Sequence, residues 1–140
     1  MSNKSKGSNA ERELVKIFTE HGWRALRAAG SGVNDDSPCD IIVGKIGKRG
    51  FAIEAKSSRK DSIYISKSQI EDFIRFAHMI GLNAAIAVKF SYEGWIFITP
   101  DKLKDSGKFW VVSRKSAVEQ GRRFSQFFED TSPQNILINP

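Results

Sequence analysis

If residues 51–56 form a β-strand, Phe51, Ile53 and Ala55 share one face, and Ala52, Glu54 and Lys56 share the other. One face of this strand would be apolar, while the opposite face would present Glu54 beside Lys56. A second apolar run covers residues 40–44 and begins with Asp40. The pattern therefore predicts two neighbouring strands that carry three charged side chains.

The segment between these two runs, residues 45–50, combines glycines with charged residues, which indicates a hairpin connection. Antiparallel pairing of the two strands would bring Asp40 back beside Glu54 and Lys56. The hairpin therefore predicts a cluster of two carboxylates and one ammonium group.

Helical periodicity appears in two further segments. In the first, apolar residues recur at helical spacing over residues 10–21, and Gly22 is a natural stop. The second begins at a capping-box pattern in residues 66–69, continues as an apolar stripe over residues 70–80 and stops at Gly81. We expect the apolar stripes of both helices to pack in the core.

The remaining apolar runs predict an edge strand, a short terminal helix and two further strands. The edge strand would be residues 109–112, and the terminal helix would be residues 116–129. The two further strands would be residues 83–90 and 95–99, joined by a turn. The expected fold is α/β, a single domain with a central mixed β-sheet flanked by helices. We expect a flexible basic tail over residues 1–8, the domain over residues 9–130 and a C-terminal tail over residues 131–140.

Composition agrees with one globular domain. The chain has 140 residues, of which 40% are hydrophobic, and nothing resembles a transmembrane span or a secretory signal. We therefore expect a soluble, cytoplasmic protein. The single cysteine, Cys39, would be a reduced, partly buried thiol. His21 and His78 are isolated in the sequence, and we assign neither a role.

Basic residues are in excess, with 22 lysines and arginines against 16 acidic residues and a formal net charge of +6. Lysine-rich surfaces often serve only solubility. A basic surface beside an acidic cluster also suits a phosphate backbone that must be held against carboxylates. The candidate DNA-binding residues are Lys4, Lys6, Arg12, Arg27, Lys45, Lys48, Arg49, Arg59, Lys60 and Lys67.

Two converging carboxylates favour a divalent cation between them. Hard oxygen ligands that leave several waters in place suit Mg²⁺, for which Mn²⁺ would substitute. The Lys56 ammonium would orient or deprotonate an attacking water and offset charge on a phosphate. The alternative is an exposed ion pair between Glu54 and Lys56 on a solvated strand face.

Glu11 is a candidate third carboxylate, because it lies near the apolar stripe of the first predicted helix. Local sequence offers a second interpretation, since Ser8 and Glu11 have the spacing of a capping box. In that case Glu11 would only satisfy the backbone amide of the Ser8 cap. Periodicity alone does not distinguish the two roles.

The order of short motifs along residues 5–100 resembles that of the archaeal Holliday junction resolvases. The motifs are a basic tail, AERE at residues 10–13, RAAGSG at 27–32, PCDII at 38–42, IEAK at 53–56, AVKF at 87–90 and GWIF at 94–97. The resemblance implies the fold of type II restriction endonucleases. It also implies a homodimer that cuts four-way DNA junctions with magnesium.

Carried over by position, the family's catalytic set falls on Glu11, Asp40, Glu54 and Lys56, with the three carboxylates as metal ligands. Ser31 matches a serine that some members use near the scissile phosphate, although an ordinary loop serine explains it equally well.

The chain departs from many relatives before the first metal-binding aspartate, because Cys39 separates Pro38 from Asp40. Asp35 and Asp36 are therefore rival ligands. We prefer Asp40, since it begins an apolar strand and would be held on a rigid element.

The resemblance also places the dimer contact in the second half of the domain. Phe76, Met79 and residues 95–98 are candidates for surplus hydrophobic surface there.

We expect a magnesium-dependent endonuclease that resolves branched DNA in recombination or repair. A twofold dimer would place one active site on each of two opposed strands of the junction. One alternative is a nuclease of the same fold that acts on another DNA or on RNA. A second is a DNA-binding architectural protein that does not cut. Recombination or replication proteins are further candidate partners.

Overall fold

The computed structural model describes residues 3–28 and 37–129, with side chains from residue 9 onward. The candidate Ser31 and the rival ligands Asp35 and Asp36 lie outside the described residues. So does the expected C-terminal tail, residues 131–140.

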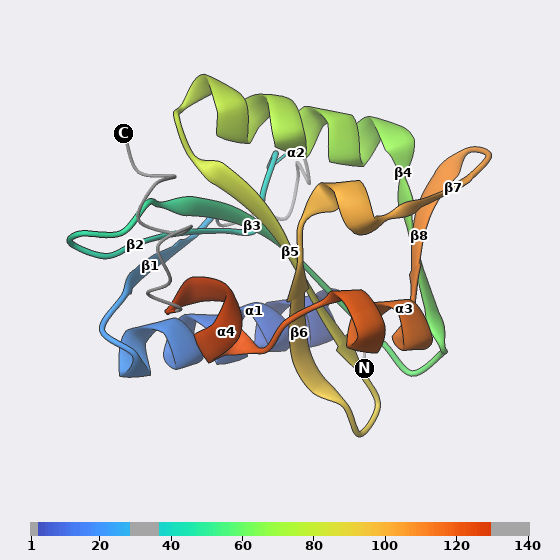
Figure 1. Ribbon diagram of the computed structural model, residues 1–140, viewed down its shortest axis with the longest axis horizontal. Helices are drawn as coiled ribbons and strands as arrows, with labels where there is room; N and C mark the ends of the chain where they lie inside the picture. Colours follow the sequence, from blue (N-terminus) through green and yellow to red (C-terminus); the bar gives the residue numbers. More distant parts are fainter. Residues whose placement is uncertain (1–2, 29–36, 130–140) are drawn as a thin grey trace.

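A five-stranded sheet forms the centre of the fold (Figure 1). The strands lie in the order β1-β2-β3-β5-β6. Their bounds are β1 (Arg24–Arg27), β2 (Ile41–Gly44), β3 (Phe51–Ser58), β5 (Asn83–Phe90) and β6 (Gly94–Ile98). β3 and β5 pair in parallel, while the other neighbours are antiparallel. The sheet is therefore mixed, as the sequence predicts.

The predicted hairpin is confirmed as the β2–β3 pair. Ile41 pairs with Ile53 and Val43 with Phe51. The connecting turn contains Gly47 at φ +81°, a left-handed conformation that glycine adopts without steric cost. The hydrophobic alternation and the glycine turn together determine this register.

Helix α1 (Asn3–Glu20) packs on one face of the sheet together with α4 (Phe124–Phe128). Leu14 and Phe18 of α1 are completely buried there. The helix ends before Gly22, as predicted, but it begins at Asn3. It therefore includes most of the segment that we expected to be a flexible tail.

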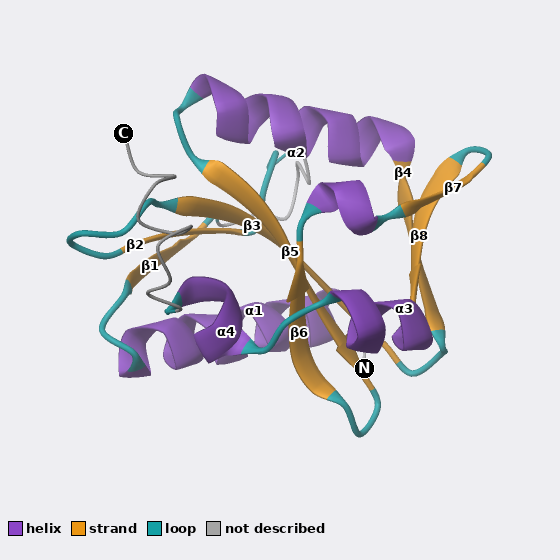
Figure 2. Cartoon of the chain, viewed as in Figure 1, coloured by secondary structure: helices purple, strands orange, loops and turns teal. Residues whose placement is uncertain are grey.

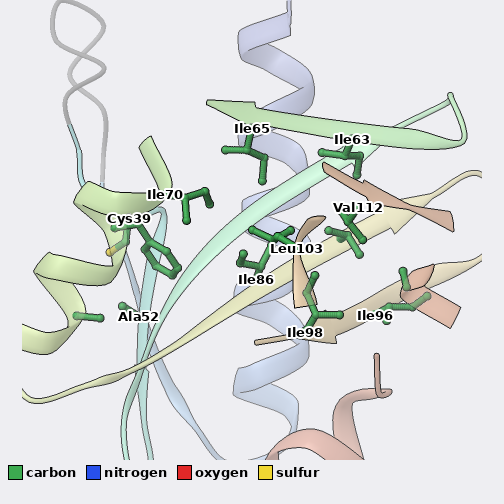
Figure 3. Packing of buried hydrophobic residues seen from close by; sticks show 14 of the residues in the cluster. Cys39, Ala52, Ile63, Ile65, Ile70, Ile86, Ile96, Ile98, Leu103 and Val112 are labelled. Atoms are coloured by element: carbon green, nitrogen blue, oxygen red, sulfur yellow. The ribbon is translucent and has the colours of Figure 1, made fainter. Parts of the chain in front are cut away.

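Helix α2 (Lys67–Met79) covers the opposite face of the sheet. The Ser66 hydroxyl accepts a hydrogen bond from the Gln69 backbone N–H, which confirms the predicted N-cap. Figure 3 shows Ile70 of this helix above the sheet, near Cys39 and Ala52, in the same core as Ile86 and Ile98.

A second, three-stranded sheet lies beside the first, and sequence patterning did not reveal it (Figure 2). Its strands are β4 (Ser62–Ser66), β8 (Phe109–Ser113) and β7 (Lys104–Ser106), with the short helix η1 (Pro100–Lys102) before β7. The predicted strand at residues 109–112 is confirmed as β8, but its predicted edge position is wrong, because β8 lies between β4 and β7.

The predicted terminal helix over residues 116–129 is instead two helices, α3 (Arg114–Gln120) and α4. The break follows Gly121, where an added Cβ would overlap Ile96 Cγ2 and lie 2.6 Å from Ala117 O. The next residue, Arg122, exchanges two backbone hydrogen bonds with Phe97 of β6. A tertiary contact with the sheet therefore interrupts the helical pattern.

Most of the residues expected to form a surplus hydrophobic surface are buried or partly buried within the monomer. Residues 95–98 of β6 are all buried within the monomer, and Phe76 is partly buried against the core. Met79 is 77% exposed, and Ile74 and Ile80 of the expected core stripe are also exposed. Within residues 3–28 and 37–129, no helix is long and apolar enough to cross a membrane.

Candidate active site

Pairing between β2 and β3 places Asp40 close to Glu54. The Asp40 N–H donates to the Ile53 carbonyl at 3.0 Å, so the β2–β3 register continues into the position of Asp40. Glu54 lies in the middle of β3, which is paired on both sides, and only 2% of the residue is exposed. The alternative of an ion pair on a solvated strand face is therefore wrong for Glu54.

The buried Glu54 carboxylate has two side-chain partners. Gln69 Nε2 of α2 donates to Glu54 Oε2 at 2.7 Å, and Lys56 Nζ lies 3.4 Å from the same oxygen. Burial, together with the nearby Asp40 charge, raises the pKa of Glu54 to about 8 despite these partners. The site therefore holds a carboxyl group in an environment that opposes its ionisation.

Asp40 is held by the backbone of the adjacent strand. The Ala55 N–H donates to Asp40 Oδ2 at 2.8 Å. Burial raises the pKa of Asp40, while this hydrogen bond and the charge of Lys56 act in the opposite direction. Asp40 thus sits on a rigid element, as its place at the start of an apolar strand predicts.

Glu11 reaches the site from α1. Its Oε1 accepts hydrogen bonds from Arg27 Nε at 3.3 Å and Nη2 at 3.2 Å. Burial and the charge of Asp40 raise the pKa of Glu11, and Arg27 counteracts them. The capping alternative does not hold, because Ser8 lies inside α1 and not at its N-terminus.

The negative charge of Asp40 therefore acts on two glutamates, since it raises the pKa of both Glu11 and Glu54. Within the described residues, no three Asp, Glu, His or Cys side chains form a cluster able to hold a metal ion. The donor chemistry nevertheless fits a hard divalent cation. A positive charge would relieve the mutual repulsion of these carboxylates, and Mg²⁺ commonly uses few protein ligands beside water.

Two residues of the site have contacts that sequence reasoning missed. The sequence identifies Gln69 only as part of a capping box, yet its side chain donates from α2 to Glu54 of β3. Arg27 was identified only as a DNA-binding candidate, yet it bonds Glu11. No local pattern reveals either contact, because each joins elements that are distant in the sequence.

The candidate DNA-binding residues differ in their surroundings. Arg12, Arg59 and Lys60 are exposed, while Lys48 and Arg49 are half-buried on the β2–β3 hairpin. Two of the lysines already have structural partners. Lys45 donates to the His21 carbonyl at 2.8 Å, and Lys67 forms an ion pair with Asp105 at 2.6 Å. The side chains of Lys4 and Lys6 lie outside the described part.

Cys39 lies directly before Asp40 and is 1% exposed. Burial raises the pKa of its thiol to about 11, so the group stays protonated at neutral pH. The sequence predicts a partly buried thiol, and the structure buries this residue almost completely.

Comparisons with known proteins identify the family to which the chain is similar. Residues 2–136 match the family described as archaeal Holliday junction resolvase (hjc). The crossover junction endodeoxyribonuclease Hjc of Methanocaldococcus jannaschii is 37% identical over 110 residues, which cover 79% of this chain and 77% of that protein. The enzyme named Hje of Saccharolobus solfataricus is 31% identical over 106 residues, covering 74% and 78% of the two chains.

The fold comparison leads to the same family. The solved structure of Archaeoglobus fulgidus Hjc, a Holliday junction resolvase from an archaeal hyperthermophile, superposes with a TM-score of 0.76 and 28% sequence identity. The match covers 87% of this chain and 94% of that one, which confirms the expected restriction-endonuclease-like fold. The chain belongs to the archaeal Holliday junction resolvase family.

Proposed function

We propose that this protein is a structure-specific endonuclease that resolves four-way DNA junctions by metal-dependent phosphodiester hydrolysis. The observation that carries the proposal is the buried Glu54 carboxyl beside Asp40 and Lys56, in a chain whose relatives are named crossover junction endodeoxyribonucleases. A buried acidic pair is costly for folding, so its presence in this chain supports a catalytic role.

Asp40 and Glu54 would hold Mg²⁺, with Mn²⁺ as a substitute, and Glu11 would complete or support the shell. When bound, the ion supplies positive charge that stabilises a pentavalent phosphate and favours deprotonation of water. The chain prepares the ligands for this task. Gln69 fixes Glu54 Oε2, the Ala55 N–H fixes Asp40 Oδ2, and Arg27 fixes Glu11 Oε1.

Lys56 is the residue that would act on the attacking water. Its ammonium lies 3.4 Å from Glu54 Oε2, and a third of its side chain is exposed, so it can face both the carboxylate and a bound phosphate. In this position it would orient the water and offset negative charge on the phosphate oxygens. Ser31 stays a further candidate near the scissile phosphate.

Junction recognition would rest on shape and on phosphate contacts. The exposed Arg12, Arg59 and Lys60 lie within four residues of Glu11 or Lys56 along the chain. A homodimer with twofold symmetry would present two such basic faces, one to each of two opposed strands. Paired cuts would then follow from the symmetry of the assembly.

The test uses a labelled four-way junction, a duplex of matched sequence, a single strand and an RNA duplex, each with Mg²⁺ and with EDTA. We expect paired, symmetric nicks in the junction only, and only with Mg²⁺. Glu54→Gln should abolish cleavage while it leaves junction binding intact. Glu71→Gln is the matched control, because Glu71 is exposed on the outer surface of α2.

Other outcomes favour the alternatives. Cleavage of the duplex or of RNA at an equal rate would indicate a same-fold nuclease with another substrate. Tight junction binding without any metal-dependent product would support an architectural protein. Sedimentation in solution should give twice the mass of one chain if the protein is a homodimer.

A further inference from the structure

A groove of about 530 Å³ opens on the face of the sheet that α1 covers, while Glu54 and Lys56 of β3 point to the opposite face, toward α2. Its walls come from three segments: α1, the end of β3 and the turn between β5 and β6. Ala10 in the first wall directly precedes Glu11, and Ser57 in the second directly follows Lys56. We call this hollow the flanking groove. A DNA strand that leaves the active site past the end of β3 could enter this groove.

The chemistry of the flanking groove suits a sugar–phosphate strand. Lys89 and Glu13 line it and neutralise each other, since Lys89 Nζ lies 2.8 Å from Glu13 Oε1. Arg59 also lines it, is exposed, and has no ion-pair partner among the described side chains. The hydroxyls of Ser57 and Ser91 add uncharged hydrogen-bonding groups. The result is one excess positive charge on a polar surface.

Tyr92 forms the tip of this wall and has an unusual conformation. It is the only residue other than glycine with positive φ in the described part of the chain, at φ 65°. The Glu93 N–H donates to the Phe90 carbonyl at 3.1 Å, which places Tyr92 at the third position of the turn. With positive φ, that position strongly favours glycine or asparagine.

Folding does not explain a tyrosine at this position. Tyr92 is 104% exposed, and its ring makes no aromatic contact with any described residue. A strained backbone under a fully exposed aromatic ring points to a contact with another molecule. The groove beneath it indicates which kind of molecule.

We propose that Tyr92 stacks on a base exposed at the branch point while the flanking groove holds the adjoining strand. This inference rests on the proposed function. An aromatic ring can stack on the face of any base, but the bases inside a continuous duplex have no free face. An opened branch point does expose base faces. Tyr92 would therefore distinguish a junction from a duplex without reading sequence.

The distances are compatible with a single strand that contacts both places. In the parallel β3–β5 register, Glu54 lies beside Ile86 and Ser58 beside Phe90, directly before the turn that carries Tyr92. Four residues of strand correspond to about 13 Å. That length equals the rise of about four stacked nucleotides. A strand cut at the active site can therefore reach the tip within a few nucleotides.

The test measures binding of a four-way junction and of a matched duplex in EDTA, so that no cleavage occurs. Tyr92→Gly should weaken junction binding about 5- to 100-fold and leave duplex binding unchanged, as expected for one lost stacking contact. Tyr92→Phe, which keeps the ring, should bind like the wild type. The melting temperature of Tyr92→Gly should be equal or higher, because glycine relieves the left-handed strain.

A photocrosslink gives an independent readout. A single 5-iododeoxyuridine at the branch point should crosslink to Tyr92, whereas the same base in the middle of an arm should not. The inference is overturned if Tyr92→Gly keeps the wild-type ratio of junction to duplex affinity, or if it weakens both substrates equally. Its failure is separable from that of the proposed function, since wild-type junction cleavage with Mg²⁺ is scored on its own.

Discussion

Glu11 and Glu13 lie two residues apart on α1, yet their surroundings act on the two carboxyls in opposite directions. Burial and the charge of Asp40 raise the pKa of Glu11. A hydrogen bond from Lys89 is the main cause that lowers the pKa of Glu13, and Trp95 Nε1 donates a second at 2.6 Å. The first carboxylate is therefore poorly accommodated as an anion, and the second is well accommodated.

This contrast separates two kinds of acidic residue. Glu13 has a cation and an indole N–H as partners and is satisfied within the monomer. Glu11 and Glu54 face a third carboxylate, Asp40, which folding alone would avoid. An unfavourable arrangement of this kind is expected where a ligand supplies the missing charge. Five predictions test this division, beginning with the largest effect.

Glu54 should make the metal-free protein less stable as pH rises. The folded state holds its carboxyl proton up to a pKa of about 8, whereas the unfolded chain releases it near 4.5. The stabilisation is therefore complete below pH 4.5 and is lost as pH rises through 8, by a few kcal/mol. Glu54→Gln should reduce this pH dependence, while the raised pKa values of Asp40 and Glu11 preserve a part of it. Urea titrations in EDTA at pH 5, 7 and 9 measure it.

A divalent metal should reverse this loss in the wild type. Addition of Mg²⁺ at pH 8 should raise the free energy of unfolding, since binding to the folded state alone stabilises it. The Glu54→Gln variant should show no such gain. An equal gain in both proteins would place the metal elsewhere.

Glu11→Gln should lower the cleavage rate about 100-fold, at the upper end of the range for polar groups around a metal. Its free energy of unfolding should stay equal or rise, because the substitution removes a carboxylate that Asp40 repels. Single-turnover cleavage of a junction and urea unfolding measure the two effects. Full cleavage activity with lowered stability would assign Glu11 a purely structural role.

Gln69→Ala should lower the cleavage rate about 10-fold, the lower end of the same range. The variant loses the 2.7 Å hydrogen bond that positions Glu54 Oε2, while Glu54 itself remains. Junction affinity should be unchanged, so the effect should appear in kcat and not in KM. Ser68→Ala, on the exposed first turn of α2, is the matched control.

Glu13→Gln should have the smallest effect, a loss of stability below about 1 kcal/mol, because the Glu13–Lys89 pair is half-exposed. The pKa of Glu13 is lowered in the folded state, so its contribution is present above pH 4.5 and is lost as pH falls. The difference between wild type and variant should therefore shrink at pH 3. A difference that grows at pH 3 would contradict this description of Glu13.

The hairpin and the helices that border it could be predicted because their signals are local. A period of two and a glycine turn determine the β2–β3 register, and hence the meeting of Asp40 and Glu54. The Ser66 cap and Gly81 mark the ends of α2 in the same way. In each case the residues that carry the signal are near one another in the chain.

The rest depended on contacts between distant elements. β7 consists of three exposed polar residues, Lys104–Ser106, which show no strand pattern. It forms because it pairs with the adjacent β8. The break between α3 and α4 depends on Ile96 against Gly121. Gln69 satisfies a local capping pattern while its side chain serves Glu54. Sequence periodicity contains no information about such pairs.

The hydrogen bond from the Ala55 N–H to Asp40 Oδ2 joins the backbone of the central sheet to the candidate metal site. The β2–β3 pairing ends at Ile53. Two residues further along β3, the Ala55 N–H donates to the Asp40 side chain in place of a backbone carbonyl of a neighbouring strand. A change of charge at the Asp40 carboxylate, such as metal binding, should therefore change the chemical shift of the Ala55 amide. In a proton–nitrogen correlation spectrum of ¹⁵N-labelled protein, the Ala55 resonance would report occupancy of the site without a substrate.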